Sequence, residues 1–327
     1  MSNAITFEAT NDEYHARSEV SNSTCSVYDR DPAEYEGRFI TKTIEPRKSD
    51  AFNFGNIWHE VCECKDGIGE NIAIVPLQFI VDGKVPEPLP EGAIEIPSHC
   101  LSASGSKAGK AWKSFKESQD PEAILIKPYE WRAATEYQNW LVENSDKVAV
   151  TSDDYKHILQ MMESVHKHKT AFELLNVAKN KAQVETNIKW TDDQTGVECR
   201  ARLDLFEPSL RATDIKSSKS AKPGEFVRDA LKYGYHRQRV WYRTAIFELT
   251  GEWIPFYYVV TEKAPPYTTE VFEFDDDMDE IAHTSIRSIL KGIAACQESG
   301  IWRRQSFGKI VKLSAPRWAH TNLEWQV

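Results

Sequence analysis

The stretch from Val197 to Ser217 limits what this chain can fold into more than any other. It contains two runs with strand character, Val197–Phe206 and Leu210–Ser217, separated by Glu207-Pro208-Ser209. Proline and serine between two such runs favour a tight turn. The stretch therefore predicts a β-hairpin.

Two acidic residues and a lysine lie close together on this predicted hairpin. Asp214 and Lys216 are two positions apart in the second strand, so their side chains leave the same face. Asp204, on the first strand, can reach that face across the hairpin. Two carboxylates beside a single lysine repel each other unless a divalent cation lies between them. Carboxylate oxygens suit Mg²⁺ or Mn²⁺, and the lysine would then orient or deprotonate a water, or neutralise charge on a phosphate.

The composition predicts a globular protein with a substantial core. The chain has 327 residues, of which 41% are hydrophobic and 28% charged, enough for one large domain or two modest ones. No repeat or low-complexity linker divides it, so we expect a single domain over residues 21–327, preceded by a flexible polar segment over residues 1–20. The formal net charge of −10 disfavours a general nucleic-acid-coating protein, but it permits an enzyme with a local basic channel.

Cysteine usage and hydropathy predict the cellular compartment of the protein. The six cysteines are scattered without a C-x-x-C pair, which favours reduced thiols and an intracellular protein. No apolar run approaches the roughly 18 residues of a membrane span. The N-terminus lacks the basic and apolar pattern of a secretory signal, so we expect a cytoplasmic protein that does not enter the membrane.

Periodicity elsewhere indicates an α/β fold. Helices are predicted over residues 128–145, 151–177 and 275–299, and a strand over 182–190. Two further strands are expected on either side of Pro265-Pro266. We therefore predict a central mixed β-sheet flanked by helices.

Basic residues outside the hairpin are candidates for contact with a nucleic-acid backbone. A predicted helix carries four lysines at steps of three, with aromatic residues between them, which suits phosphate tracking and base stacking. A solvated amphipathic helix explains the same pattern equally well. The lysines are Lys107, Lys110, Lys113 and Lys116. Lys219 and Lys222 follow the acidic hairpin, and Arg237 lies on a later helix from which it could reach DNA.

Two residue pairs lie one helical turn apart and so share a helix face. Gly55 precedes His59 by four positions, and Gln238 precedes Tyr242 by four. A glycine lets a helix approach a sheet closely, and a neutral imidazole can complete a site made of carboxylates. A single histidine on an apolar helix is, however, usually an ordinary core or surface residue.

Together these motifs resemble the PD-(D/E)xK nuclease superfamily, and within it the RecE (exonuclease VIII) branch, with RecB nuclease domains and lambda exonuclease as more distant relatives. The resemblance runs from about residue 21 to 320. It begins with a Ser-capped helix pair and ends in closing tryptophan motifs. The residues that carry it are Ser23, Tyr28, Pro32, Tyr35, Gly55, His59, Asp204, Asp214, Lys216, Gln238, Tyr242, Trp302, Pro316 and Trp318.

The resemblance implies a specific active site. His59, Asp204, Asp214 and the carbonyl of Ile215 would hold one or two Mg²⁺ ions, which Mn²⁺ could replace. Lys216 would orient or activate a water, helped by Gln238 and Tyr242. Some relatives place an upstream glutamate near the metal, a position that Glu185 would take; in the histidine-bearing branch that glutamate is often only structural. Some relatives also carry an iron–sulfur cluster on four cysteines after the core, but only Cys296 follows it here, so no cluster is expected.

The resemblance also implies an exonuclease that degrades double-stranded DNA ends from 5′ to 3′ and leaves 3′ single-stranded tails for recombination. It further implies a single-strand annealing partner of the RecT type, a homo-oligomeric ring, and a phage or prophage origin in the cytoplasm of a bacterial host. Two alternatives stay open. One is a nuclease of the same fold with another substrate, such as a single-strand nuclease or a repair or restriction endonuclease. The other is a catalytically inactive DNA-binding module.

Overall fold

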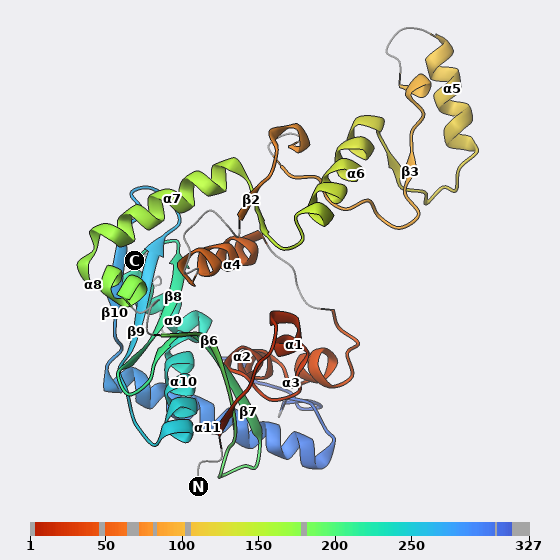
Figure 1. The fold of residues 1–327 in the computed structure, drawn as a ribbon. Helices are drawn as coiled ribbons and strands as arrows, with labels where there is room; N and C mark the ends of the chain where they lie inside the picture. Colours follow the sequence, from red (N-terminus) through yellow and green to blue (C-terminus); the bar gives the residue numbers. More distant parts are fainter. Residues whose placement is uncertain are drawn as a thin grey trace, which may run out of the picture.

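A computed structural model describes residues 4–45, 50–63, 72–80, 84–101, 106–177, 182–304 and 306–315. Its centre is a six-stranded mixed sheet in the order β1-β6-β7-β8-β9-β10, antiparallel except for the parallel pair β8 and β9 (Figure 1). The strands are β1 (Ile5–Thr6), β6 (Gln183–Thr191), β7 (Glu198–Glu207), β8 (Arg211–Ser218), β9 (Phe256–Glu262) and β10 (Thr269–Phe272). This arrangement confirms the predicted α/β fold with a central mixed sheet.

Helices cover both faces of the sheet, because its strands carry apolar side chains on each face. One face packs against α2 (Asn22–Arg30), α3 (Pro32–Tyr35), α9 (Pro223–Tyr233), α10 (Tyr235–Thr250) and α11 (Asp276–Ser299), with the π-helical turn η1 (Glu36–Ile40) following α3. The other face packs against α4 (Asp50–Glu63), α7 (Ser152–Lys167), α8 (Lys169–Phe172) and the π-helical turn η4 (Glu173–Val177). In the described part of the chain, every helix is too short or too polar to cross a bilayer.

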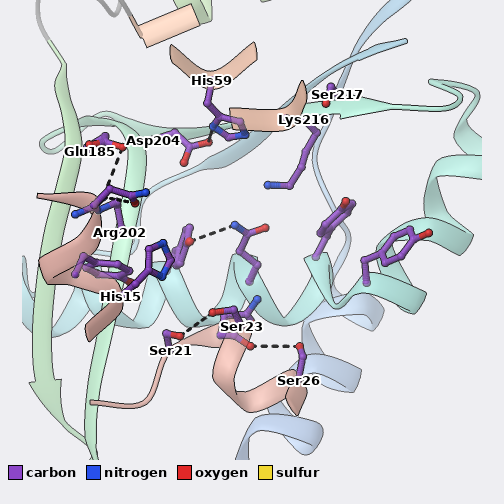
Figure 2. Close-up of a pocket in the computed structure, with 18 of the residues that line it drawn as sticks. His15, Ser21, Ser23, Ser26, His59, Glu185, Arg202, Asp204, Lys216 and Ser217 are labelled. Carbon is purple, nitrogen blue, oxygen red and sulfur yellow. Dashed lines mark hydrogen bonds and ion pairs between the residues drawn. The ribbon is translucent and has the colours of Figure 1, made fainter. Parts of the chain in front are cut away.

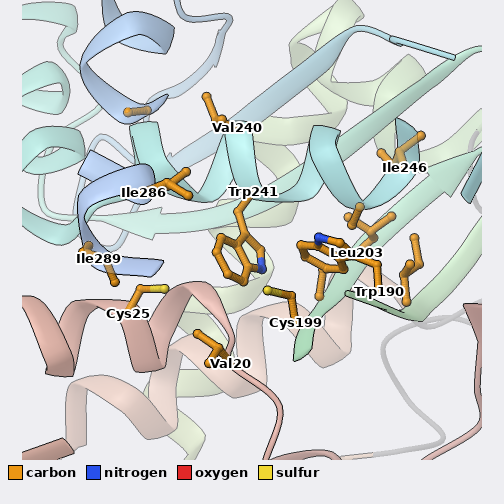
Figure 3. Close-up of a cluster of buried hydrophobic side chains, with 14 of the residues drawn as sticks. Val20, Cys25, Trp190, Cys199, Leu203, Val240, Trp241, Ile246, Ile286 and Ile289 are labelled. Carbon is orange, nitrogen blue, oxygen red and sulfur yellow. The ribbon is translucent and has the colours of Figure 1, made fainter. Parts of the chain in front are cut away.

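The larger core lies between the sheet and α10, α11 and α2 (Figure 3). Trp241 of α10 meets Trp190 of β6 edge to face, with ring centroids 5.2 Å apart. Its indole N–H donates a 2.9 Å hydrogen bond to the carbonyl of Arg200 on β7. Since both tryptophans are buried, this contact fixes the position of α10, the helix that carries Gln238 and Tyr242, against the sheet.

The described residues between 72 and 150 form an arm that extends beyond the sheet (Figure 1). Two short parallel strand pairs join its parts, β2 with β5 and β3 with β4. Its elements are β2 (Ile72–Ile74), η2 (Leu77–Phe79), β3 (Ile94–Glu95), η3 (Ser98–Cys100), α5 (Ser106–Glu117), β4 (Leu125–Ile126), α6 (Pro128–Glu143) and β5 (Val148–Val150). A small core around Phe79 and Tyr137 holds α6 to the base of the arm.

The N-terminal residues correct one expectation. Residues 1–20 were expected to be flexible, yet β1 is the edge strand of the sheet, and α1 (Asn11–Ala16) packs beside it. Tyr14 is 7% exposed, and two guanidinium groups lie over its ring, that of Arg200 at 4.6 Å and that of Arg202 at 4.3 Å from the ring centroid. The polar composition concealed this contact, because the apolar partner of the arginines is a single tyrosine ring. Residues 1–3 lie outside the described part.

We expect Tyr14→Ala to lower the free energy of unfolding by about 3 kcal/mol, because it removes a buried ring and uncovers two arginines. Tyr14→Phe keeps the ring and should cost less than about 1.5 kcal/mol. Urea denaturation of the two variants measures the difference. Equal stability of Tyr14→Ala and the unmodified protein would show that residues 4–20 contribute nothing to the fold.

Candidate active site

Asp204 lies where two central strands separate. The β7–β8 pairing runs from Glu207↔Arg211 to Leu205↔Thr213, and Asp204 comes next. There its carboxylate Oδ2 accepts a 2.8 Å hydrogen bond from the Ile215 N–H, so a side chain has replaced the ladder bond. Side-chain alternation also shifts at this point, since Leu203 packs in the α10 core whereas Leu205 packs in the α4 core. The shift separates the two strands and turns Asp204 toward the cleft.

Asp214 is the most deeply buried acid of the site. It is 1% exposed, and the Lys216 ammonium forms an ion pair with its Oδ2. The Gln238 amide donates a 2.8 Å hydrogen bond to Oδ1 of Asp214 and a 3.2 Å bond to the Tyr242 hydroxyl. Apart from the Lys216 contact, Oδ2 has no hydrogen-bond partner among the described residues. A buried carboxylate oxygen left in this state can accept a further cation.

Burial and charge set the protonation of this pair. Burial raises the pKa of Asp214 to about 6; the Asp204 charge raises it too, and the Lys216 charge opposes both. Burial alone would lower the pKa of Lys216, but the charges of Asp214 and Asp204 outweigh burial and raise it. Lys216 is therefore a cation at neutral pH.

His59 approaches Asp204 from α4, which packs on the sheet face opposite α10. It projects from α4, and its Nδ1 lies 3.3 Å from Asp204 Oδ2. Gly55, one turn earlier, also lines the cleft, but a Cβ added there would meet nothing within 4 Å. The glycine was expected to allow close packing of the helix on the sheet; instead it leaves open space in front of the histidine.

A cleft of about 910 Å³ runs between these groups and the N-terminal helices (Figure 2). Figure 2 shows His59, Asp204 and Lys216 on one side of the cleft and Ser21, Ser23 and Ser26 of the α2 region on the other. The cleft is lined by Asn11, Tyr14, His15, Ser21, Asn22, Ser23, Ser26, Val27, Arg30, Arg38, Gly55, His59, Glu60, Glu185, Arg202, Asp204, Lys216, Ser217, Tyr233, Tyr235, Gln238, Tyr242 and Lys263.

The donor set fits a divalent metal ion. Asp204 and Asp214 supply carboxylate oxygens, His59 supplies an imidazole nitrogen, and this mixture suits Mg²⁺ or Mn²⁺. Among the described residues, no three such side chains are already gathered at metal-binding distances. His59 and Lys216 instead pair with one carboxylate each, and these are the contacts that a bound cation would replace or rearrange.

Glu185 lies in the same row of the sheet as Asp204. The β6–β7 register pairs Val184 with Leu205 and Thr186 with Leu203, which brings Glu185 opposite Asp204. Its backbone is left-handed, with φ of 48°, an unusual conformation for glutamate. Its carboxylate lies 3.7 Å from the Arg202 guanidinium, and Glu185 lines the cleft.

The residues predicted to contact DNA lie in different parts of the structure. Lys110 and Lys113 are exposed on α5, in the arm and distant from the cleft (Figure 1). The side chain of Lys107 lies outside the described residues. Lys219 and Lys222 are exposed beyond the end of β8. None of the five described residues in this set lines the cleft; they are Lys110, Lys113, Lys219, Lys222 and Arg237.

Arg237 requires a correction. It was expected to reach DNA, but it is 8% exposed and its guanidinium is occupied within the protein. It forms a 2.6 Å ion pair with Asp29 and hydrogen bonds with Ser26 and Ser285. These contacts join α10 to α2 and α11, so Arg237 stabilises the packing of three helices.

Several cleft residues were not identified as site residues from the sequence, and three of them lie beside Lys216 or its strand. The ring of Tyr235 lies 5.1 Å from the Lys216 ammonium, and Tyr233 and Lys263 also line the cleft. Tyr235 is three residues before Gln238 on one helix face, a spacing that could have indicated it. Lys263 gave no such signal, because the parallel pairing of β8 with β9 that brings it to the site is not visible in the sequence.

Comparisons with known proteins place the chain in a family and match its fold. The model of a family described as a PDDEXK-like domain of unknown function (DUF3799) matches residues 94–309. A crystal structure of a "putative exonuclease" from Eubacterium rectale resembles the chain with a TM-score of 0.51 at 11% sequence identity, covering 98% of this chain and 100% of that one. At that identity the likeness concerns the fold alone. Among curated proteins, none matches this sequence.

The raised pKa of Asp214 predicts how stability depends on pH without metal. Its carboxyl binds a proton more tightly in the folded state than at its ordinary pKa of 3.8, so unfolding releases protons between pH 3.8 and about 6. The free energy of unfolding should therefore fall as pH rises through that window. In Asp214→Asn this contribution should vanish. Urea denaturation in EDTA at pH values from about 4 to 7, roughly the range in which this carboxyl titrates, measures the free energy of unfolding and tests this prediction. Parallel pH profiles for the two proteins would contradict the assigned burial of the charge.

Proposed function

The chain belongs to this PDDEXK-like family, and on that premise we propose that it is a divalent-metal-dependent nuclease that hydrolyses phosphodiester bonds of DNA. One observation carries the proposal. Asp204, Asp214 and Lys216 meet at the separated ends of β7 and β8, with Gln238 bonded to Asp214 and His59 beside Asp204, at the wall of a cleft. Structural ion pairs alone do not require two neighbouring acids, a lysine and a histidine to gather beside one open cavity.

The proposed metal ligands are His59, Asp204, Asp214 and the carbonyl of Ile215. Bound there, a divalent ion would supply Lewis-acid polarisation of the phosphate and a lowered pKa for a coordinated water. We assign Mg²⁺ as the natural ion, with Mn²⁺ as a substitute, because the donors are chiefly hard oxygens.

The remaining groups position the reactants. Lys216 presents a permanent cation from the same strand face as Asp214, where it can orient a water or stabilise charge on the phosphate. Gln238 holds the Asp214 carboxylate through its amide and links it to the Tyr242 hydroxyl, so rotation of either side chain is restricted. Burial of Tyr242 raises its pKa well above the ordinary value, so it remains protonated and can act only as a neutral hydrogen-bonding group.

We further propose an exodeoxyribonuclease that degrades double-stranded ends from 5′ to 3′ and leaves 3′ tails for recombination. The motif resemblance to RecE-type enzymes supports this, and the Eubacterium rectale protein of shared fold carries an exonuclease name. The same resemblance supports a RecT-type annealing partner, a homo-oligomeric ring and a phage or prophage origin.

The alternatives make different predictions for the substrate. An endonuclease of this fold would cut circular DNA, and a single-strand nuclease would prefer single-stranded DNA. An inactive DNA-binding module would cut neither. The complete set of acids, lysine and glutamine disfavours the last alternative.

Digestion of end-labelled linear duplex, circular duplex and single-stranded DNA with Mg²⁺ separates these functions. We expect the linear duplex to be degraded, the circle to be spared, and EDTA to abolish the activity. Asp214→Ala should lose activity by about three orders of magnitude or more, because a metal ligand is lost, yet remain folded. Lys216→Ala should also be strongly impaired.

Two results would each contradict one part of this assignment, either the metal site or the role of Lys216. Digestion by Asp214→Ala at the rate of the unmodified protein would exclude the metal site. Full activity of Lys216→Ala would exclude only the role of the lysine. Thermal melting of each variant controls for folding.

A further inference from the structure

Lys263 is a cleft-lining cation that the proposed metal site does not use. It follows β9, and its backbone N–H donates a 2.9 Å hydrogen bond to the carbonyl of Ser218 at the end of β8. The pairing of β8 with β9 therefore brings it beside the strand that carries Asp214 and Lys216. Both Lys263 and the neighbouring Ser217 line the cleft.

No acidic side chain neutralises Lys263 in the described part of the chain. Its ammonium lies 5.4 Å from the Phe54 ring centroid on α4, and it forms none of the ion pairs found among the described residues. Burial lowers the pKa of Lys263, with no carboxylate opposing this effect. A partly buried ammonium without an acid is unfavourable in the protein alone, but it is suited to an anionic ligand in the cleft.

An aromatic pair, Tyr233 and Tyr235, lies near Lys216 in the same cleft. Tyr235 is held in place, because its backbone carbonyl accepts a 2.7 Å hydrogen bond from the Tyr258 hydroxyl and its ring stacks on Phe226. The Tyr233 ring lies 6.0 Å from the Tyr235 ring, is 53% exposed, and also lines the cleft. An exposed aromatic ring that lines a nucleic-acid cleft can stack on a base.

We propose that this side of the cleft is a subsite for one nucleotide of the DNA strand next to the scissile phosphate, in which Lys263 contacts a backbone phosphate and Tyr233 stacks on the base. The subsite rests on the proposed nuclease function. It specifies the ligand further: a nucleotide whose base is unstacked from its neighbours, as at a frayed or single-stranded end. Tyr233 ends α9 and Lys263 follows β9, and the fold brings both to one cavity.

Salt-dependent DNA binding tests the phosphate contact without relying on cleavage. Fluorescence anisotropy of an end-labelled duplex with a short single-stranded tail is measured in EDTA over a range of salt concentrations. Lys263→Gln should weaken binding about 10-fold and reduce the slope of log K against log salt by about one, as expected for the loss of one phosphate contact. Lys263→Arg keeps the charge and should preserve most of the slope. Lys291→Gln, which removes an exposed lysine on α11, is the matched control and should change neither quantity.

Replacement of bases in the single-stranded tail tests the stacking contact. Tyr233→Leu should weaken binding to the normal tail about 10-fold, whereas Tyr233→Phe should not. If each nucleotide of the tail in turn is made abasic, one position should weaken binding to the unmodified protein but not to Tyr233→Leu. A structural role for Tyr233 would weaken binding to every tail equally.

The outcomes separate this inference from the proposed function. If the unmodified protein digests DNA while Lys263→Gln keeps its affinity and salt slope, the phosphate contact is wrong and the nuclease assignment stands. If no tail position couples to Tyr233, the stacking contact is wrong. If the unmodified protein digests no DNA with Mg²⁺ or Mn²⁺, the proposed function fails and the subsite fails with it.

Discussion

The burial of Asp214 against Lys216 is the interaction on which the rest of the site depends. A carboxylate that is 1% exposed is unstable as an anion unless cations or hydrogen-bond donors surround it. Lys216 and Gln238 supply that compensation from one strand and one helix. The compensation is incomplete, because burial still raises the pKa of Asp214 to about 6. In the proposed function, a bound metal ion would relieve this cost, which the fold has already incurred.

The surrounding fold holds this pair at the edge of a cavity. β7 and β8 are joined near the hairpin turn and separate at Asp204, where a side chain takes over the hydrogen bond of the ladder. Helix α4 approaches one side of this opening, α10 the other, and the N-terminal segment forms a further wall through Tyr14 and its two arginines. The reactive groups are therefore rigidly placed on strands and helices, which catalytic geometry requires.

Individual residues show where local sequence reasoning succeeded and where it failed. The hairpin, the shared face of Asp214 and Lys216, and the stacking of Gln238 over Tyr242 follow from strand and helix periods, and the structure has all three. Arg237 has the same charge as a DNA-binding arginine, yet Asp29, which lies 208 positions away in the sequence, pairs with it and removes it from the surface. Residues 4–20 look polar and loose, but their order depends on contacts with β6 and β7. Partners distant in the sequence decide such cases, and no local pattern records them.

The sequence by itself determined the kind of chemistry available, because strand and helix periodicity is a local property and the acids, the lysine and the glutamine fall on predictable faces of their own elements. Only the tertiary structure decided which cations face the cleft and which are neutralised inside the protein. Lys263 reaches the site through the parallel pairing of β8 with β9, and Arg237 is withdrawn by helix packing. The physical reason is that burial and charge pairing depend on neighbours in space, and for these residues the neighbours come from segments far apart in the chain.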